Sequence, residues 1–184
     1  MRFIRYTDVE HPDFGAVWRL YTESFPLYEQ RYISDQAAAM KDPRYYCCSV
    51  WKDAVFVGLL FYWKLDSLYY VEHFAVCQNR RGQGEGSACI EAFCKDKPIT
   101  ALEIDPPMDM LSRRRLAFYK RLGFRENPLA YSHPPYRREY SPHALSLLSR
   151  PEMLSKEVCI QFGEELESRV MAYAQGRWEP KGRQ

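Results

Sequence analysis

The sequence lacks the patterns that mark membrane, secreted or nucleic-acid-binding proteins. No apolar run approaches the length of a membrane span, and the N-terminus MRFIRYTD carries charges where a secretory signal would be apolar. The formal net charge of +2 is too small to argue for nucleic acid as a partner. We therefore expect a cytoplasmic protein that binds neither a membrane nor, as its main partner, nucleic acid.

Metal-ligand and disulfide patterns are missing as well. Six cysteines are present, but no Cys-x-x-Cys pair occurs among them. Cys47 and Cys48 are adjacent, and the others lie in apolar contexts or alone on a late helix, which favours reduced thiols acting as small hydrophobic side chains. The four histidines show no metal-ligand spacing. No metal is expected.

The length and the hydrophobic pattern predict one domain of mixed secondary structure. A chain of 184 residues with 46% hydrophobic content can bury a sizeable core. Apolar periodicity predicts strands at 2–7, 45–51, 55–65, 68–76, 99–104, 125–132 and 138–148. Helices are predicted at 13–25, 34–40 and 155–173. Two more are predicted, one that begins at the glycines near residue 84 and is stopped by Pro98, and one that Ser112 caps and that ends at Gly123. We expect residues 1–175 to form the domain and 176–184 a flexible tail.

The most informative segment is VEHFAVCQNRRGQGEGSAC, residues 71–89. An apolar strand runs into Gly82, Gly84 and Gly86 and then into a helix. Because glycine has no Cβ and tolerates positive φ, successive backbone N–H groups can converge there on an anion at the positive end of the helix. The segment therefore predicts a site for a phosphate-bearing ligand.

This segment does not match either of two common phosphate-binding motifs. No Lys-Ser/Thr follows the glycines, as a nucleoside-triphosphate loop requires. The spacing also differs from Gly-x-Gly-x-x-Gly, and the next strand ends in Asp105-Pro106-Pro107 without a ribose-binding context. A P-loop and a dinucleotide site are both disfavoured.

Two motifs together resemble the GNAT superfamily of acyl-CoA-dependent N-acetyltransferases. Arg81-Gly82-Gln83-Gly84-Glu85-Gly86 is similar to its acyl-CoA loop, Gln/Arg-x-x-Gly-x-Gly/Ala, and Phe118-Tyr119-Lys120-Arg121-Leu122-Gly123-Phe124 is similar to its Tyr-x-x-x-Gly-Phe element. The resemblance extends over residues 2–140 and points to a bacterial subgroup of unassigned substrate. It implies an α/β (α+β) fold in which helices flank a mixed, mostly antiparallel central sheet.

The resemblance also implies a reaction: direct attack of a primary amine, on a small molecule or a peptide, on the acetyl group of acetyl-CoA in a ternary complex. An amine with a pKa of about 10.4 must lose a proton before it attacks. The leaving thiolate, whose thiol has a pKa of about 8.5, is helped by gaining one. A base and an acid are therefore both expected.

Tyr119 and Glu72 are the catalytic candidates. Tyr119 matches the family tyrosine whose hydroxyl reaches the thioester sulfur, the alternative being core packing with Leu116 and Leu122. Glu72 lies on the strand that lines the family's active site; as a base it needs a partly desolvated carboxyl with a raised pKa, the alternative being a salt-bridged strand residue. His73 points to the opposite face if the strand is regular, and either His73 or bulk water could supply the base instead.

The cofactor contacts are implied by the same resemblance. In the family, the strand before the loop pairs through its backbone with the pantetheine arm, and the loop holds the phosphates. The expected cofactor-binding residues are Phe74, Ala75, Val76, Arg81, Gly82, Gln83, Gly84, Glu85, Gly86, Ser87, Ser112 and Tyr119. Ser112 stands where many relatives carry Asn, so its contact is the least supported.

Substrate contacts are expected after the first helix and on the late strands. The candidates are Tyr28, Glu29, Arg31, Tyr131 and Tyr136. Aromatic side chains with one carboxylate suit a cationic amine, although an ordinary tyrosine-rich surface has the same composition.

Other function classes stay open. The domain could bind acyl-CoA without turnover, as a sensor or interaction module. Alternatively, Arg80-Arg81 and Arg113-Arg114-Arg115 could contact RNA or a ribosomal surface, which a steep salt dependence of binding would reveal. The acceptor amine, an acyl group other than acetyl and a homodimer are not decided by sequence.

Overall fold

The computed structural model describes residues 1–128 and 131–174. Its strands are β1 Arg2–Tyr6, β2 Tyr45–Lys52, β3 Val55–Lys64, β4 Tyr69–Val76, β5 Thr100–Ile104, β6 Arg125–Glu126, β7 Tyr131–His133 and β8 His143–Arg150. Its α-helices are α1 Phe14–Ser24, α2 Ile33–Ala39, α3 Glu85–Cys94, α4 Met110–Arg121 and α5 Lys156–Glu165. A short 3₁₀ turn, η1 Leu27–Glu29, precedes α2.

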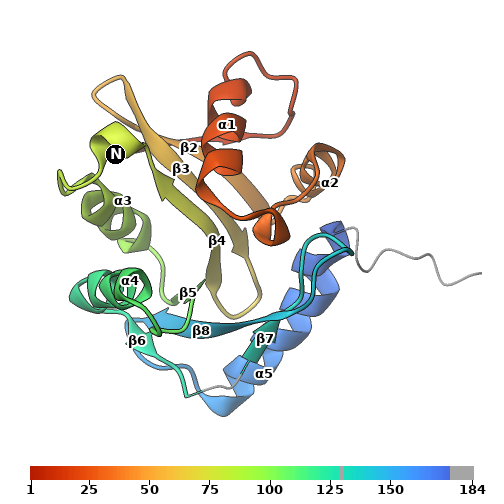
Figure 1. Cartoon of the computed structure of the whole chain (residues 1–184), viewed down its shortest axis with the longest axis vertical. Coiled ribbons are helices and arrows are strands. Elements are labelled where there is room, and N and C mark those ends of the chain that lie inside the picture. Colours follow the sequence, from red (N-terminus) through yellow and green to blue (C-terminus); the bar gives the residue numbers. More distant parts are fainter. Residues whose placement is uncertain (129–130, 175–184) are drawn as a thin grey trace, which may run out of the picture.

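The strands form one twisted sheet in the order β1-β2-β3-β4-β5-β8-β6, and β7 pairs with β8 (Figure 1). Neighbouring strands run antiparallel except β4 and β5, which are parallel. The expected mixed, mostly antiparallel sheet flanked by helices is confirmed. Within the described ranges, none of the helices combines the length and the apolarity that a bilayer span requires.

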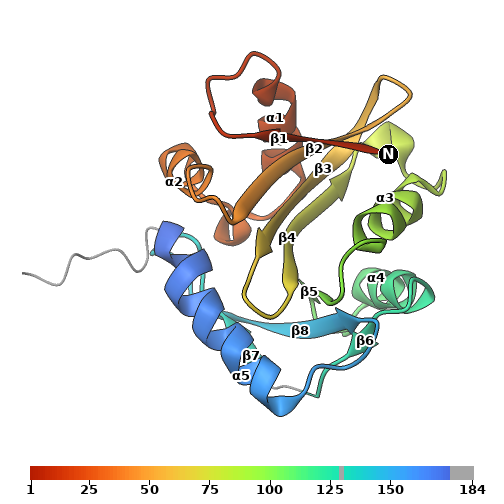
Figure 2. The same ribbon diagram turned by 180° about the vertical axis from the view of Figure 1, so that it is seen from behind.

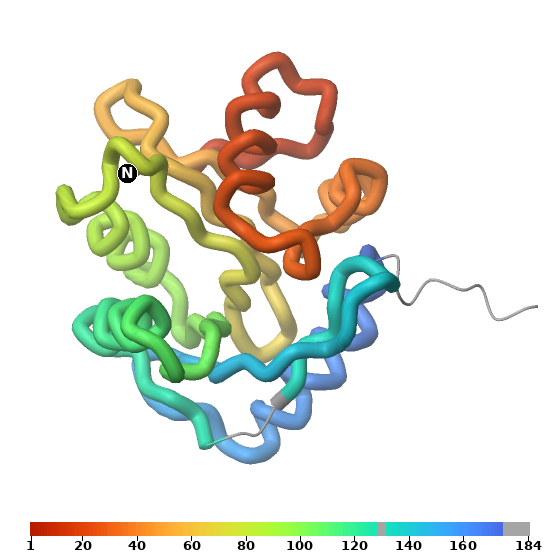
Figure 3. Tube along the Cα trace, viewed as in Figure 1, coloured from red at the N-terminus to blue at the C-terminus, as the bar shows by residue number. Residues whose placement is uncertain are grey.

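Helices cover both faces of the sheet (Figures 1 and 2). Leu59 and Phe61 of β3 belong to one core, with α1, α2 and α5, while the intervening Leu60 belongs to the other, with α3 and α4. Side chains of a strand alternate between faces, so a central strand buried on both sides is apolar throughout. The trace in Figure 3 shows the C-terminal helical segment running beside the β7–β8 hairpin.

A bulge in β4 positions the functional site. In the β3–β4 register, Phe61 pairs with His73 and Tyr62 with Val71, which leaves Glu72 without a partner on β3. On its other side, β4 pairs with β5 only from Tyr69 to Val71. An extra residue bends a strand and increases its twist, so β4 and β5 separate beyond this point. The backbone of β4 after Val71 is left without a strand neighbour on the side of β5.

Most predicted elements are confirmed, and the differences lie late in the chain. The strand predicted at 125–132 is split into β6 and β7, because Pro128 has no N–H for the ladder. The strand predicted at 138–148 begins only at His143, directly after Pro142. The last helix is α-helical to Glu165 and continues as a π turn and a 3₁₀ turn to Tyr173. The predicted tail, 176–184, lies outside the described residues.

Candidate active site

A cavity of about 440 Å³ lies where β4 and β5 separate. Its walls include residues 70–76 of β4 and residues 102–105 at the end of β5. Arg81 of the glycine segment lies at one part of the wall, and Tyr28, Glu29 and His143 contribute another. The cavity therefore joins the phosphate loop predicted from sequence to the predicted substrate residues.

The glycine loop has the geometry that its sequence predicts. Gly82 and Gly84 have φ angles of +77° and +78°, which residues with a Cβ rarely adopt. Gly86 is different: its φ is not positive, and a Cβ there would make only an ordinary contact, 3.5 Å from Cγ2 of Val76. Gly84 is the N-cap of α3 and no side chain caps the helix. The first N–H groups of α3 are thus available to an anion.

Side chains of the loop stabilise the loop itself. Gln83 Nε2 donates a hydrogen bond to the carbonyl of Asn79 at 2.8 Å. Glu85 is buried, with its carboxylate 3.5 Å from Nη1 of Arg80 and 3.8 Å from Nζ of Lys52. Gln83 and Glu85 can therefore serve a ligand through their backbone, while their side chains hold the loop in place.

The structure fits the CoA-type ligand expected from the resemblance. Phe74, Ala75 and Val76 line the cavity, and their backbone edge facing β5 is outside the sheet ladder. An extended arm can bind such an edge as an added strand would. The uncapped start of α3 can hold phosphates at one end of that arm.

Tyr119 lines the cavity from α4 and is also packed. Its ring makes edge contacts with Phe118 and Phe124, with centroids 5.0 and 5.5 Å apart. Burial raises the pKa of the phenol well above its ordinary value. The hydroxyl is therefore protonated at neutral pH, as a proton donor must be.

Ser112 is placed differently from the expectation. Asp109, not Ser112, is the N-cap of α4: the N–H of Ser112 donates to Asp109 Oδ1 at 2.8 Å, and the N–H of Asp109 donates to Ser112 Oγ at 3.1 Å. This is a reciprocal capping box, in which the third helical residue also takes part. Ser112 is buried and is not part of the cavity wall, so nothing in its position supports a cofactor contact.

Glu72 does not have the environment that a general base requires. Arg31 donates to both of its carboxylate oxygens, Nη1 to Oε2 at 2.8 Å and Nη2 to Oε1 at 2.5 Å, and both side chains are fully buried. Tyr136 adds a hydroxyl donor to Oε1 at 2.8 Å. Burial alone would raise the pKa of Glu72, but the Arg31 guanidinium outweighs it and holds the pKa far below the usual range. The expected raised pKa is wrong.

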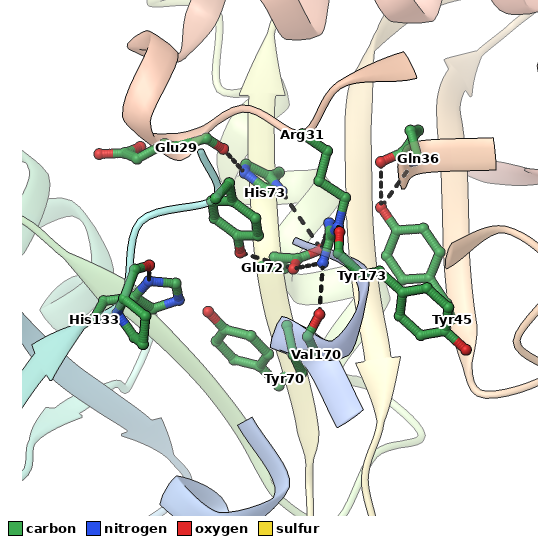
Figure 4. A network of polar contacts seen from close by, with 12 residues as sticks. Glu29, Arg31, Gln36, Tyr45, Tyr70, Glu72, His73, His133, Val170 and Tyr173 are labelled. Carbon is green, nitrogen blue, oxygen red and sulfur yellow. Dashed lines mark hydrogen bonds and ion pairs between the residues drawn. The ribbon is translucent and has the colours of Figure 1, made fainter. Parts of the chain in front are cut away.

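Arg31, which was expected to contact substrate, is instead fully buried. Besides Glu72, its guanidinium donates to the carbonyls of Val170 and Tyr173, each at 3.2 Å (Figure 4). It therefore ties the segment before α2 to β4 and to the C-terminal helical segment. Arg31 is absent from the cavity wall, and a direct substrate contact is not supported.

His73 does not face away from Glu72, because the strand is not regular there. The bulge brings Nδ1 of His73 within 3.6 Å of Oε2 of Glu72. Its Nε2–H donates to the backbone carbonyl of Glu29 at 2.9 Å, and its ring packs edge-on against Tyr21 and Phe25. This histidine joins β4 to η1.

Glu29 and Tyr28 lie on the cavity wall, as expected for substrate contacts. The Glu29 side chain is 23% exposed, and its Oε1 lies 3.9 Å from Nε2 of His143. Burial raises the pKa of Glu29 and lowers the pKa of His143. Tyr136 also lines the cavity. The side chain of Tyr131 lies outside the described part of the structure.

Among the cavity residues that sequence reasoning did not select are Glu103, His133 and His143. Glu103 accepts a hydrogen bond from the Tyr70 hydroxyl at 2.6 Å and lies 3.7 Å from Nε2 of His133. Burial lowers the pKa of His133 to about 4. Glu103 could have been selected from sequence, because it is a carboxyl residue in an otherwise apolar strand. Nothing in the sequence around the two histidines marks them as cavity residues.

Comparisons with known proteins agree with this architecture. The model of the acetyltransferase (GNAT) family matches residues 14–124. A protein of Bacteroides thetaiotaomicron assigned to the GNAT family has a solved structure with a TM-score of 0.87 and 25% identity, covering 93% of this chain and 98% of that one. A comparison with curated protein sequences gave no match.

Two more distant structures share the fold. The ribosomal-protein-S18-alanine N-acetyltransferase of Escherichia coli has a TM-score of 0.57 at 17% identity, covering 85% of this chain and 96% of that one. Arabidopsis thaliana Naa50, in complex with the bisubstrate analogue CoA-Ac-MVNAL, has a TM-score of 0.55 at 18% identity, covering 82% and 99%.

Proposed function

The chain belongs to the GNAT family of acetyltransferases, and from this premise we propose that residues 1–175 form one domain that transfers the acetyl group of acetyl-CoA to a primary amine. The observation that carries the proposal is one cavity lined by an unpaired strand edge, a buried tyrosine and Arg81, where Arg81 belongs to the loop that leads into the uncapped start of α3. These are a site for an extended arm, a proton donor and a phosphate site.

The donor substrate binds along β4. Main-chain groups of Gly82 to Ser87 hold the phosphates, with Arg81 adding positive charge at the cavity wall. The backbone of Phe74 to Val76 holds the extended arm. When bound, acetyl-CoA supplies a thioester-activated acetyl group, and the buried hydroxyl of Tyr119 gives a proton to the leaving sulfur.

The acceptor is a small molecule rather than a polypeptide. Residues 27–32 and residues 134–142, which together we name the clasp, meet beside the cavity. The N–H of Tyr136 donates to the carbonyl of Tyr28 at 3.1 Å, and Arg137 Nε donates to the carbonyl of Gln30 at 3.0 Å. The guanidinium of Arg137 also lies 4.4 Å from the ring centre of Tyr32. A polypeptide entering between the two segments would have to break these contacts, whereas a small amine needs no such opening.

A panel of acceptors tests the proposal. Spermidine, tyramine, lysine, n-butylamine and a hexapeptide are incubated with acetyl-CoA, and thiol release and product mass are measured. We expect thiol release with at least one small amine and little with the hexapeptide. Calorimetry that shows acetyl-CoA binding without thiol release for any acceptor would instead support a non-catalytic acyl-CoA sensor.

A further inference from the structure

We propose that Glu29, rather than Glu72, binds the ammonium of the acceptor and receives its first proton. The inference rests on the proposed acetyl transfer and names the residue that prepares the acceptor. It starts from the acidic residues of the cavity wall, which are Glu29, Glu72, Glu103 and Asp105.

The four carboxylates differ in how their charge is balanced. Glu72 is paired with Arg31, and Asp105 lies 2.7 Å from Nη1 of Arg115. Glu103 accepts a hydrogen bond from the Tyr70 hydroxyl and is only 4% exposed, compared with 23% for Glu29. Among the described residues, the ionic partner of Glu29 is His143, at 3.9 Å. Because burial lowers the pKa of His143, that imidazole is neutral at pH 7 and leaves the carboxylate charge available to a cation.

Glu29 is also held in position by its backbone. Its carbonyl accepts hydrogen bonds from Nε2 of His73 at 2.9 Å and from the Tyr21 hydroxyl at 3.2 Å. In Figure 4 the side chain of Glu29 extends away from Arg31 and Glu72. The main chain is anchored on the buried network, and the partly exposed carboxyl lies on the cavity wall.

The aromatic surroundings suit a cation. Tyr28, on the same turn, lies on the cavity wall with its ring 4.9 Å from the ring of His143. A ring face and a carboxylate are the two groups that stabilise an alkylammonium ion. Acceptors with a positive charge at the reacting end are therefore favoured over neutral or acidic ones.

The proton balance follows from these positions. The ammonium gives one proton to the Glu29 carboxylate, and the neutral amine then forms a C–N bond with the acetyl carbonyl carbon. As the C–S bond breaks, the sulfur gains the proton of the Tyr119 hydroxyl, and the second proton lost by the nitrogen restores that hydroxyl. Glu29 is 23% exposed and can return its proton to solvent. One proton is released per turnover.

A pH profile distinguishes this role from a structural one. The groups facing Glu29 from other elements are His73 of β4, Glu103 and Asp105 at β5, Arg115 of α4 and His143 of β8. Burial is the largest influence and raises the pKa of Glu29; His73 and Arg115 lower that pKa, and Asp105 and Glu103 raise it. Since the active form is the carboxylate, kcat/KM should rise with pH through that raised pKa and then level off.

The test compares Glu29→Gln with wild type and with Glu23→Gln, an exposed acid of α1 outside the cavity wall. We expect Glu29→Gln to lower kcat/KM about 10²-fold or more with n-butylamine and with the best amine of the panel, and to remove the inflection. Its melting temperature at pH 7.5 should not fall, because a carboxyl with a raised folded-state pKa costs stability once it is ionised. Glu23→Gln should match wild type throughout.

A second measurement uses the protein without acyl-CoA. The carboxyl carbon of Glu29, assigned in ¹³C NMR by its absence in Glu29→Gln, should titrate above the ordinary value of about 4.3 and shift when n-butylamine hydrochloride is added. A titration at or below that value, or unchanged kcat/KM and pH profile in Glu29→Gln, overturns the inference. If wild-type protein acetylates no amine, the proposed function fails, and the NMR titration still decides the state of Glu29.

Discussion

The buried pair Arg31–Glu72 makes the sharpest prediction about stability. Glu72→Gln keeps the shape of the side chain but removes its charge, which leaves a fully buried guanidinium without a counter-ion. Two charge-assisted hydrogen bonds are weakened together with the one from Tyr136. Breaking a buried pair by removing one partner typically costs about 3–5 kcal/mol, and we expect a loss of that size. Urea unfolding at pH 7 measures it.

The same pair predicts a pH dependence. The folded-state pKa of Glu72 is depressed, so its contribution to stability is fully present above the unfolded-state pKa of about 4.3 and is lost as pH falls below that value. In Glu72→Gln the free energy of unfolding should therefore fall less steeply in acid. A double-mutant cycle with Arg31→Met should show strong coupling, the double variant being more stable than the sum of the two losses predicts.

The chain offers a matched control. Arg169 and Asp66 form a pair with the same two-bond geometry, at 2.8 and 2.8 Å, but on the surface. Asp66→Asn should cost far less than Glu72→Gln, because water screens an exposed pair. If the two substitutions cost the same, or if Glu72→Gln costs less than about 1 kcal/mol with an unchanged acid slope, the argument from burial is refuted.

Three further predictions concern the cavity. Gly84→Val should weaken acetyl-CoA binding about tenfold or more in calorimetry, because a β-branched residue opposes the φ of +78°. The control Gly15→Ala should bind acetyl-CoA as wild type does. Equal affinities of Gly84→Val and wild type would contradict the phosphate site. Tyr119→Phe keeps the ring and should lower kcat about 10²-fold or more with acetyl-CoA affinity nearly unchanged; wild-type turnover with rate-limiting chemistry would reduce Tyr119 to core packing. Arg137→Ala removes a clasp bond and should raise the rate with the hexapeptide relative to n-butylamine, and an unchanged ratio would argue against the clasp as a size filter.

The local features of the fold could be predicted from sequence because their causes are local. Gly82 and Gly84 adopt positive φ just before a helix, and Gly123 does so at the end of α4, as glycine at those places indicates. Pro26 follows the end of α1 by two residues, and Pro98 follows the end of α3 by four. The two motifs that carry these glycines also indicated the family, since each is a short run of consecutive residues.

The bulge at Glu72 could not be predicted, because it depends on pairing between strands. Its position follows from which residues of β3 lie opposite His73 and Val71, and a register is set by the whole sheet. The expectation that His73 and Glu72 face apart used the regular alternation of one strand. One inserted residue was enough to bring the two side chains together.

The chemical roles of the acids were decided by the tertiary structure. In sequence, Glu72 and Glu29 are both single carboxyls beside aromatic residues, and Glu72 was the preferred base because of its strand. Folding brings Arg31, 41 residues away, onto Glu72 and lowers the pKa of that carboxyl, whereas Glu29 is left on the cavity wall with a raised pKa. The residue types and the phosphate loop follow from the sequence by itself, but which carboxyl can accept a proton depends on burial and on charges from distant segments, because both act through space.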